Sequence, residues 1–174
     1  DWGTQFGQLI VAYKKWGSEN AHKTYTVTDL NNLYVRFHQE AEKNPGLEDE
    51  ARAWFKKLES GDFEAKDLWQ HFKDISLKEF QKIYDMLGIH FDAFVGESFY
   101  NTMVEDTITR IKEKGLAKVS EQALIIDLEP YTMPPCLLRK KDDTTLYATR
   151  DIAAAEYRKK TYDFDKMIYV VGSE

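Results

Sequence analysis

Apolar residues recur every three to four positions through the first half of the chain, which is the spacing of amphipathic helices. The first stripe runs over residues 4–16 and stops at Gly17, a residue type that often follows a helix. Residues 18–25 are polar and predict a loop. Four more helices are predicted: one capped by Thr28, one over residues 47–59, one over residues 63–72, and one opened by the Ser-Leu-Lys-Glu capping box at 76–79 and closed by Gly88. The pattern therefore predicts a mainly helical segment over residues 1–88.

The pattern changes after Gly88. Residues 89–95 alternate in polarity and predict a short strand, and residues 101–114 predict a helix that stops at Gly115. The remaining predicted elements are strands at 117–119, 123–128 and 136–140, a turn at 142–144, a strand at 144–148, a helix from Asp151 and a strand from Lys166. We therefore expect an α/β chain, with a mixed segment over residues 89–174 that ends in a β-α-β unit of the parallel type.

The composition does not indicate a particular function, but it excludes some classes of function. The 174 residues are 43% hydrophobic and 31% charged, which is typical of an ordered globular protein. A net charge of −6 excludes a broad basic surface that would bind nucleic acid by itself. It does not exclude a nucleic-acid partner that is held mainly by another part of a longer protein. The single cysteine, Cys136, cannot form an internal disulfide, and no apolar run approaches the length of a membrane span. These features predict a cytoplasmic protein without membrane contact.

The sequence contains no pattern typical of a metal site or of a catalytic nucleophile. The four histidines, at positions 22, 38, 71 and 90, lack the spacing of a metal site. Phosphate-binding glycine loops and nucleophile elbows are also missing from the sequence. We therefore expect no metal site and name no catalytic residue.

The two ends suggest a piece of a longer protein. The chain opens on Asp1 without a methionine and stops just after the strand-like run at 167–171. A final strand without a covering element exposes unpaired backbone groups, which can pair with another chain. We therefore expect this piece to self-associate.

Tyr147 and Asp151 lie four residues apart where a predicted strand meets a predicted helix. In one interpretation, Asp151 caps the helix and Tyr147 fills the core. In the other, the two form a cation pocket: a carboxylate can accept two parallel hydrogen bonds from a guanidinium, and a phenol can add an acceptor or a stacking face. Strand-to-helix junctions of α/β proteins are common places for ligands.

Two other stretches leave similar alternatives open. In Asp-Trp-Gly-Thr-Gln-Phe-Gly, residues 1–7, the glycines permit tight turns or close backbone approach, and Trp2 is either a core residue or a flat surface for a ligand. In Gly-Glu-Ser, residues 96–98, Glu97 either stabilises the start of a helix or contacts a ligand.

Taken together, residues 1–7, 96–101 and 146–153 resemble the arginyl-tRNA synthetases, and their order and spacing match along the whole chain. The closing Tyr-Val-Val-Gly-Ser-Glu also resembles the strand before a Gln-His segment in that family. The resemblance implies a class I catalytic core, a Rossmann-like fold split by a helical insertion. It also implies an enzyme that activates L-arginine with ATP and Mg²⁺ as an arginyl-adenylate and transfers the arginine to tRNA(Arg).

The same resemblance implies roles for four residues. Tyr147 and Asp151 would line the arginine pocket, and Trp2 and Glu97 would border it. The HIGH-type and KMSKS-type motifs that bind ATP, together with the tRNA-binding domains, are expected outside this piece, so the isolated fragment should be inactive. The turn at 142–144 lacks the glycine that is usual in the family. The alternative is a truncated, non-catalytic paralogue that binds arginine or a protein partner, which the reading frame on either side would reveal.

Overall fold

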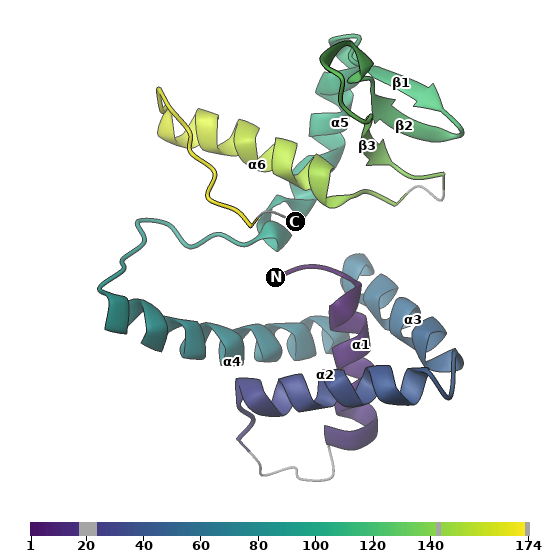
Figure 1. Ribbon diagram of the computed structural model, residues 1–174, viewed down its shortest axis with the longest axis vertical. Coiled ribbons are helices and arrows are strands. Elements are labelled where there is room, and N and C mark those ends of the chain that lie inside the picture. Colours follow the sequence, from purple (N-terminus) through teal and green to yellow (C-terminus); the bar gives the residue numbers. More distant parts are fainter. Residues whose placement is uncertain (18–23, 142–143, 173–174) are drawn as a thin grey trace. The chain divides into compact units, whose positions relative to one another are not determined.

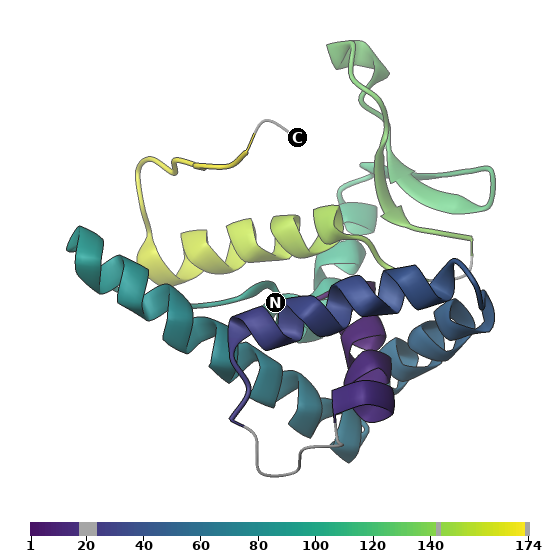
Figure 2. The same ribbon diagram turned by 60° about the horizontal axis from the view of Figure 1, so that its bottom comes forward.

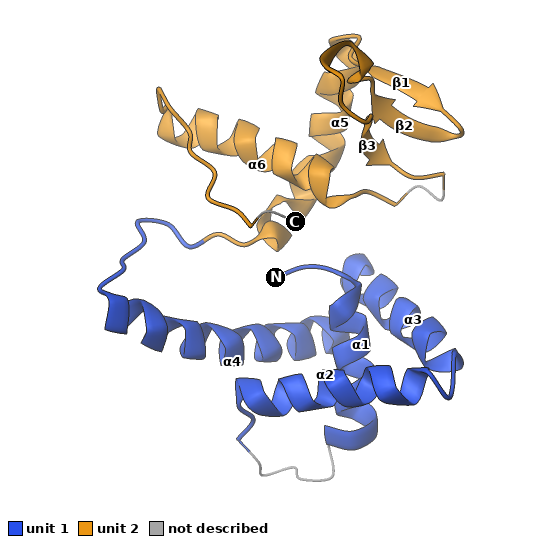
Figure 3. Cartoon of the chain, viewed as in Figure 1, with its two compact units in different colours: residues 1–94 blue, residues 95–174 orange. Residues whose placement is uncertain are grey.

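The computed structural model describes residues 1–17, 24–141 and 144–172, and it forms two compact units, residues 1–94 and residues 95–174 (Figures 1 and 3). Most of the predicted loop at 18–25 and of the predicted turn at 142–144 lies outside the described residues.

The first unit is helical, as the apolar periodicity predicted. Its helices are α1 (Thr4–Ala12), continued by a π-helical turn (Tyr13–Gly17), α2 (Val27–Ala41), α3 (Gly46–Ser60) and α4 (Phe63–Leu87). Helix α1 contacts the other three and packs most extensively against α3 (Figures 1 and 2). The core of this unit holds Ile10, Val11, Phe37, Leu58 and Phe72, each less than 2% exposed.

Two predicted helix starts were wrong. Helix α2 is capped by Thr26 and not by Thr28, because Thr26 and Asp29 form a reciprocal capping box. Residues 63–87 form one helix instead of two. The hydroxyl of Ser76 donates to the carbonyl oxygen of Phe72 at 2.9 Å, so this serine is satisfied inside the helix and caps nothing.

The predicted strand at 89–95 is not formed. Helix α4 ends at Gly88, which has the left-handed conformation that favours glycine. Beyond it, the rings of Phe91 and Phe94 pack near Tyr84, with centroids 4.8 Å and 6.3 Å from the tyrosine ring. The aromatic residues that gave the segment its strand-like pattern therefore pack back on the helix instead of joining a sheet.

The second unit combines helices with a small sheet. Its elements are the 3₁₀-helices η3 (Glu97–Met103) and η4 (Glu129–Tyr131), the helices α5 (Val104–Glu113) and α6 (Tyr147–Tyr162), and the strands β1 (Ala117–Ser120), β2 (Ala123–Ile126) and β3 (Cys136–Arg139). The predicted helix before Gly115 and the three predicted strands after it are confirmed. The strands form an antiparallel sheet in the order β1-β2-β3, with an irregularity in the register of β2 and β3 between Leu124 and Ile125.

The predicted parallel β-α-β unit at the end of the chain was wrong. Helix α6 begins at Tyr147 and not at Asp151, and a single bridge between Arg139 and Thr145 is all that remains of the predicted strand at 144–148. After α6, the described residues up to 172 form no strand. Among the described residues, the strands that pair in the sheet are β1, β2 and β3, and both of their pairings are antiparallel.

Candidate functional site

The start of α6 carries both residues of the predicted cation pocket. Tyr147 is the first residue of the helix and Asp151 the fifth, so they lie one turn apart on the same side. Tyr147 is 70% exposed, so it is not a core residue. The helix is capped by Leu146 without any side-chain hydrogen bond, so Asp151 is not its cap. The interpretation of the pair as a cap and a core residue was therefore wrong.

Asp151 is an exposed carboxylate, and no hydrogen bond or ion pair joins it to any other residue of the described part. Helix α6 is basic near its other end, where Lys159 and Lys160 lie in the last turn. A carboxylate without a partner, beside a phenol and on a rigid helix, can accept two parallel hydrogen bonds from a planar guanidinium.

The start of α6 is fixed by a buried hydrogen bond to the sheet. The hydroxyl of Thr149 donates to the carbonyl oxygen of Leu138 in β3 at 2.7 Å, and both residues are fully buried. Further along, Ala153 and Ala154 pack against Tyr100 of η3. Small residues let η3 approach the helix closely, so the turn that carries Tyr147 and Asp151 is held between β3 and η3.

Glu97 reaches the same turn of α6 through an ion pair. The Nε atom of Arg150 donates to Oε1 of Glu97 at 2.5 Å, and the two side chains are only 11% and 30% exposed. The structure therefore brings the Gly-Glu-Ser stretch to the helix of Tyr147 and Asp151. Sequence reasoning singled out Glu97 but missed Arg150, because the two residues are 53 positions apart and neither has a local partner.

A second ion pair holds α6 to α5. The guanidinium of Arg110 donates from Nε and Nη2 to the two carboxylate oxygens of Glu156 at 3.2 Å and 2.6 Å, and the hydroxyl of Thr107 donates to the same carboxylate at 2.8 Å. The hydrogen bond from Arg110 lowers the pKa of Glu156, against the effect of partial burial. This pair lies more than a helical turn beyond Asp151 in the sequence, and we assign it a structural role.

Trp2 lies in the first unit, where it packs against other aromatic residues. Its ring centroid is 5.8 Å from that of Phe55 and 5.8 Å from that of Trp69. The indole of Trp69 donates in turn to the backbone carbonyl of Asp1 at 2.8 Å. Trp2 is half-buried, so the structure supports a packing role within this unit.

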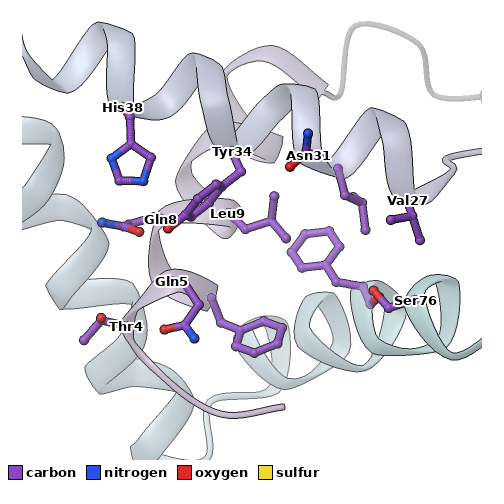
Figure 4. Close-up of a pocket in the computed structure, with 12 residues that line it drawn as sticks. Thr4, Gln5, Gln8, Leu9, Val27, Asn31, Tyr34, His38 and Ser76 are labelled. Atoms are coloured by element: carbon purple, nitrogen blue, oxygen red, sulfur yellow. The ribbon is translucent and has the colours of Figure 1, made fainter. Parts of the chain in front are cut away.

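The first unit also contains a pocket of about 650 Å³ between α1, α2 and α4 (Figure 4). Its polar lining consists of Thr4, Gln5, Gln8, Asn31, Tyr34, His38 and Ser76. Figure 4 shows the labelled side chains of α1 and α2 facing one another across this space. The amide of Gln8 also donates to both carboxylate oxygens of Glu48 at 3.2 Å. The pocket offers amide, hydroxyl and imidazole groups over an apolar floor, and it includes three residues of the stretch at 1–7.

Within the described residues, no group of three or more His, Cys, Asp or Glu side chains is arranged to hold a metal ion. Across the same residues, none of the helices has both the length and the apolar character needed to cross a membrane.

Comparison with known proteins gives a consistent result. The sequence pattern of the family "tRNA synthetases class I (R), catalytic domain" matches residues 1–174. Arginine–tRNA ligases of Enterococcus faecalis, Clostridioides difficile and Halothermothrix orenii are 59%, 58% and 57% identical to the chain over all of its 174 residues. The chain spans 31% of the length of each of these relatives.

A solved structure supports the same relationship. The arginyl-tRNA synthetase of Plasmodium falciparum aligns with 91% of this chain at a TM-score of 0.75 and 29% sequence identity, and the match covers 26% of that protein.

Proposed function

Because this chain belongs to the catalytic-domain family of class I arginyl-tRNA synthetases, we propose that it is part of a longer enzyme that joins L-arginine to tRNA(Arg) with ATP. The family, which the sequence indicated through residues 1–7, 96–101 and 146–153, is confirmed over the whole chain, and so is the class I catalytic-domain assignment. The fold of this part is mostly helical with a small antiparallel sheet.

The proposed reaction has two steps. An oxygen of the arginine carboxylate attacks the α-phosphorus of ATP, and the bond to pyrophosphate breaks, which gives arginyl-adenylate. A ribose hydroxyl at the end of the tRNA then attacks the arginyl carbonyl carbon, and AMP leaves. No covalent bond to the enzyme forms, so the contribution of the protein is to position the substrates and to stabilise charge.

ATP and its Mg²⁺ belong to the longer enzyme in this proposal. Mg²⁺ in nucleotide sites is usually held by substrate phosphates and water together with one or two carboxylates, so we propose that it arrives with the nucleotide. The HIGH-type and KMSKS-type ATP-binding sequences of the family do not occur among the 174 residues. We therefore propose that the 174 residues alone do not charge tRNA.

The arginine side chain would bind at the start of α6. One observation carries this assignment: Asp151 is an exposed carboxylate without a partner in the described part, one helical turn from the exposed phenol of Tyr147. A bidentate contact distinguishes a guanidinium from the ammonium of lysine, whose single nitrogen cannot donate two parallel hydrogen bonds to the two oxygens. Glu97, held beside this turn by Arg150, would border the pocket. For Trp2, packing against Phe55 and Trp69 in its own unit accounts for its position, and we assign it no contact with the arginine.

A charging assay tests the proposal. A full-length enzyme that contains these residues should transfer labelled arginine, but not lysine, to tRNA(Arg) in the presence of ATP and Mg²⁺. The purified 174-residue chain should give no more than the blank. A full-length protein that charges no arginine would overturn the proposed function, and charging by the 174 residues would overturn the proposed dependence on the rest of the enzyme.

Two further features belong to the same proposal. A cytoplasmic location follows from the use of charged tRNA in translation. Self-association of the isolated piece would follow from the segment at 167–171, in which Ile168, Val170 and Val171 are 73%, 93% and 79% exposed.

A further inference from the structure

We propose that Arg150 is a positioning residue for arginine recognition: it holds the carboxylate of Glu97 beside the turn of α6 that carries Tyr147 and Asp151. The inference rests on the proposed function, because it concerns the geometry of the proposed arginine pocket. It adds a residue that the family resemblance did not assign.

The contact itself is well defined. Nε of Arg150 donates to Oε1 of Glu97 at 2.5 Å, and the arginine side chain is only 11% exposed. A charged side chain this far removed from water is stabilised by its partner, and removal of one partner leaves the other charge uncompensated. Arg150 and Glu97 therefore fix each other's positions in a way that an exposed pair would not.

Helix geometry places this contact next to the pocket. Tyr147, Arg150 and Asp151 occupy positions i, i+3 and i+4 of α6, which lie on adjacent parts of one helix face. The carboxylate of Glu97 that Arg150 binds therefore lies against the segment of α6 that also carries Tyr147 and Asp151. Arg150 thus connects η3, where Glu97 is the first residue, to the turn that carries the other two pocket residues.

The packing of η3 on α6 does not depend on the ion pair. Tyr100, Ala153 and Ala154 are at most 4% exposed and form an apolar cluster between the two elements. The rings of Phe99 and Tyr157 add an edge contact with centroids 5.1 Å apart. Loss of Arg150 should therefore release the side chain of Glu97 without separating η3 from α6.

Whether the removal of Arg150 weakens or strengthens the binding of arginine distinguishes a positioning role from a purely electrostatic one. Arg150 is a cation beside a pocket proposed for a cation. If only its charge mattered, its removal would favour the binding of arginine, since like charges repel. If it positions Glu97, its removal should weaken binding, because an unpaired Glu97 can turn away or compete with Asp151 for the incoming guanidinium.

The experiment uses a full-length enzyme that contains these residues and measures tRNA charging at varied arginine concentration. Arg150→Gln should raise the KM for arginine about tenfold or more, with kcat within about threefold and the KM for ATP unchanged. Arg150→Lys, which retains the charge but loses the planar donor group, should give an intermediate KM. Arg110→Gln is the matched control, because it breaks the other ion pair of α6, to Glu156, and should leave the KM for arginine within about twofold.

The outcomes separate this inference from the function on which it rests. If Asp151→Asn raises the KM for arginine and Arg150→Gln leaves it unchanged or lowers it, the positioning role is overturned and the pocket stands. If neither variant changes the KM, the arginine pocket itself is overturned. If Arg150→Gln lowers kcat and the melting temperature together, and Arg150→Lys restores neither, Arg150 serves the fold alone and the inference is overturned.

Discussion

Gly7 of α1 lies directly against the backbone of Ala51 in α3: a Cβ atom on Gly7 would come within 2.1 Å of the Ala51 carbonyl oxygen. The neighbour is backbone and cannot rotate away, so the two helices touch at a point where only glycine fits. The second glycine of the stretch at 1–7 thus has a packing function in the first unit. Gly3 is the N-cap of the same helix, and its φ of +148° is a backbone conformation that residues with a side chain rarely adopt.

Gly7→Ala should therefore destabilise the chain by roughly 1–3 kcal/mol, the usual cost of forcing an extra carbon into a packed interface. The measurement is the urea midpoint of the 174-residue chain. Gly172→Ala is the control, because no atom lies within 4 Å of the carbon that it adds. An unchanged midpoint for Gly7→Ala would show that α1 and α3 separate freely at this point.

Periodicity predicted the helices well and the last strand badly, for a physical reason. A helix satisfies its backbone locally, so the apolar stripes over residues 4–16 and 47–59 were enough to place α1 and α3. A strand needs a neighbour. The Met-Ile-Tyr-Val-Val run at 167–171 has the composition of a strand, but the structure offers no edge that it pairs with.

The candidate site shows the same limit. Tyr147 and Asp151 could be chosen from sequence because they are four residues apart and carry a recognisable chemistry. Arg150 sits between them in the sequence and still could not be chosen, because its meaning depends on Glu97, which is 53 residues away. A pattern of local spacing cannot reveal a partner that only the packing of η3 on α6 brings close.

The pairing of Glu156 with Arg110 predicts a pH dependence of stability. Arg110 lowers the pKa of Glu156 in the folded chain, so the unfolded chain binds more protons in the acid range. The stabilisation is therefore present above the ordinary value of about 4.5 and is lost as the pH falls through the lowered folded value. Glu156→Gln should lower the urea midpoint at neutral pH, and the difference from the unchanged chain should shrink on acidification.

The check is a set of urea midpoints between about pH 7 and about pH 3, a range that spans the titration of a carboxyl group. Because the pair is partly exposed, about 1 M salt should reduce the difference at neutral pH. A difference between the two chains that is the same at every pH would mean that the charge of Glu156 contributes nothing.

The exposed segment at 167–171 predicts concentration-dependent association of the isolated chain. Val170 is 93% exposed and Val171 79% exposed, and a lysine in such a segment discourages both apolar contact and strand pairing. Sedimentation velocity over a wide concentration range should therefore detect association of the unchanged chain and less of Val170→Lys. Thr161→Lys, at an exposed position of α6, is the control for added charge. If the unchanged chain is monomeric at all concentrations, this segment is not an association surface.

Asp151→Asn tests the arginine pocket in the full-length enzyme most directly. The change keeps the size of the side chain and removes its charge. Because Asp151 has no partner in the described part and caps no helix, the melting temperature should stay unchanged. Recognition of arginine should weaken by about 2–4 kcal/mol, the scale for the loss of one member of a close charged pair. That range corresponds to about 30- to 1000-fold in kcat/KM for arginine, with the KM for ATP little changed.

The matched control for Asp151→Asn is Asp163→Asn, which makes the same chemical change just after the other end of α6. Asp163 is 91% exposed and pairs with Lys159 at 2.8 Å, and asparagine tolerates the left-handed conformation found there. Both variants remove one negative charge, so a general effect of charge on the binding of arginine, ATP or tRNA should appear in both. A specific loss at Asp151 alone would place the guanidinium at the start of α6. If charging by Asp151→Asn stays within about threefold of the unchanged enzyme, a change of under 1 kcal/mol, the guanidinium binds elsewhere and Tyr147 loses its proposed role with it.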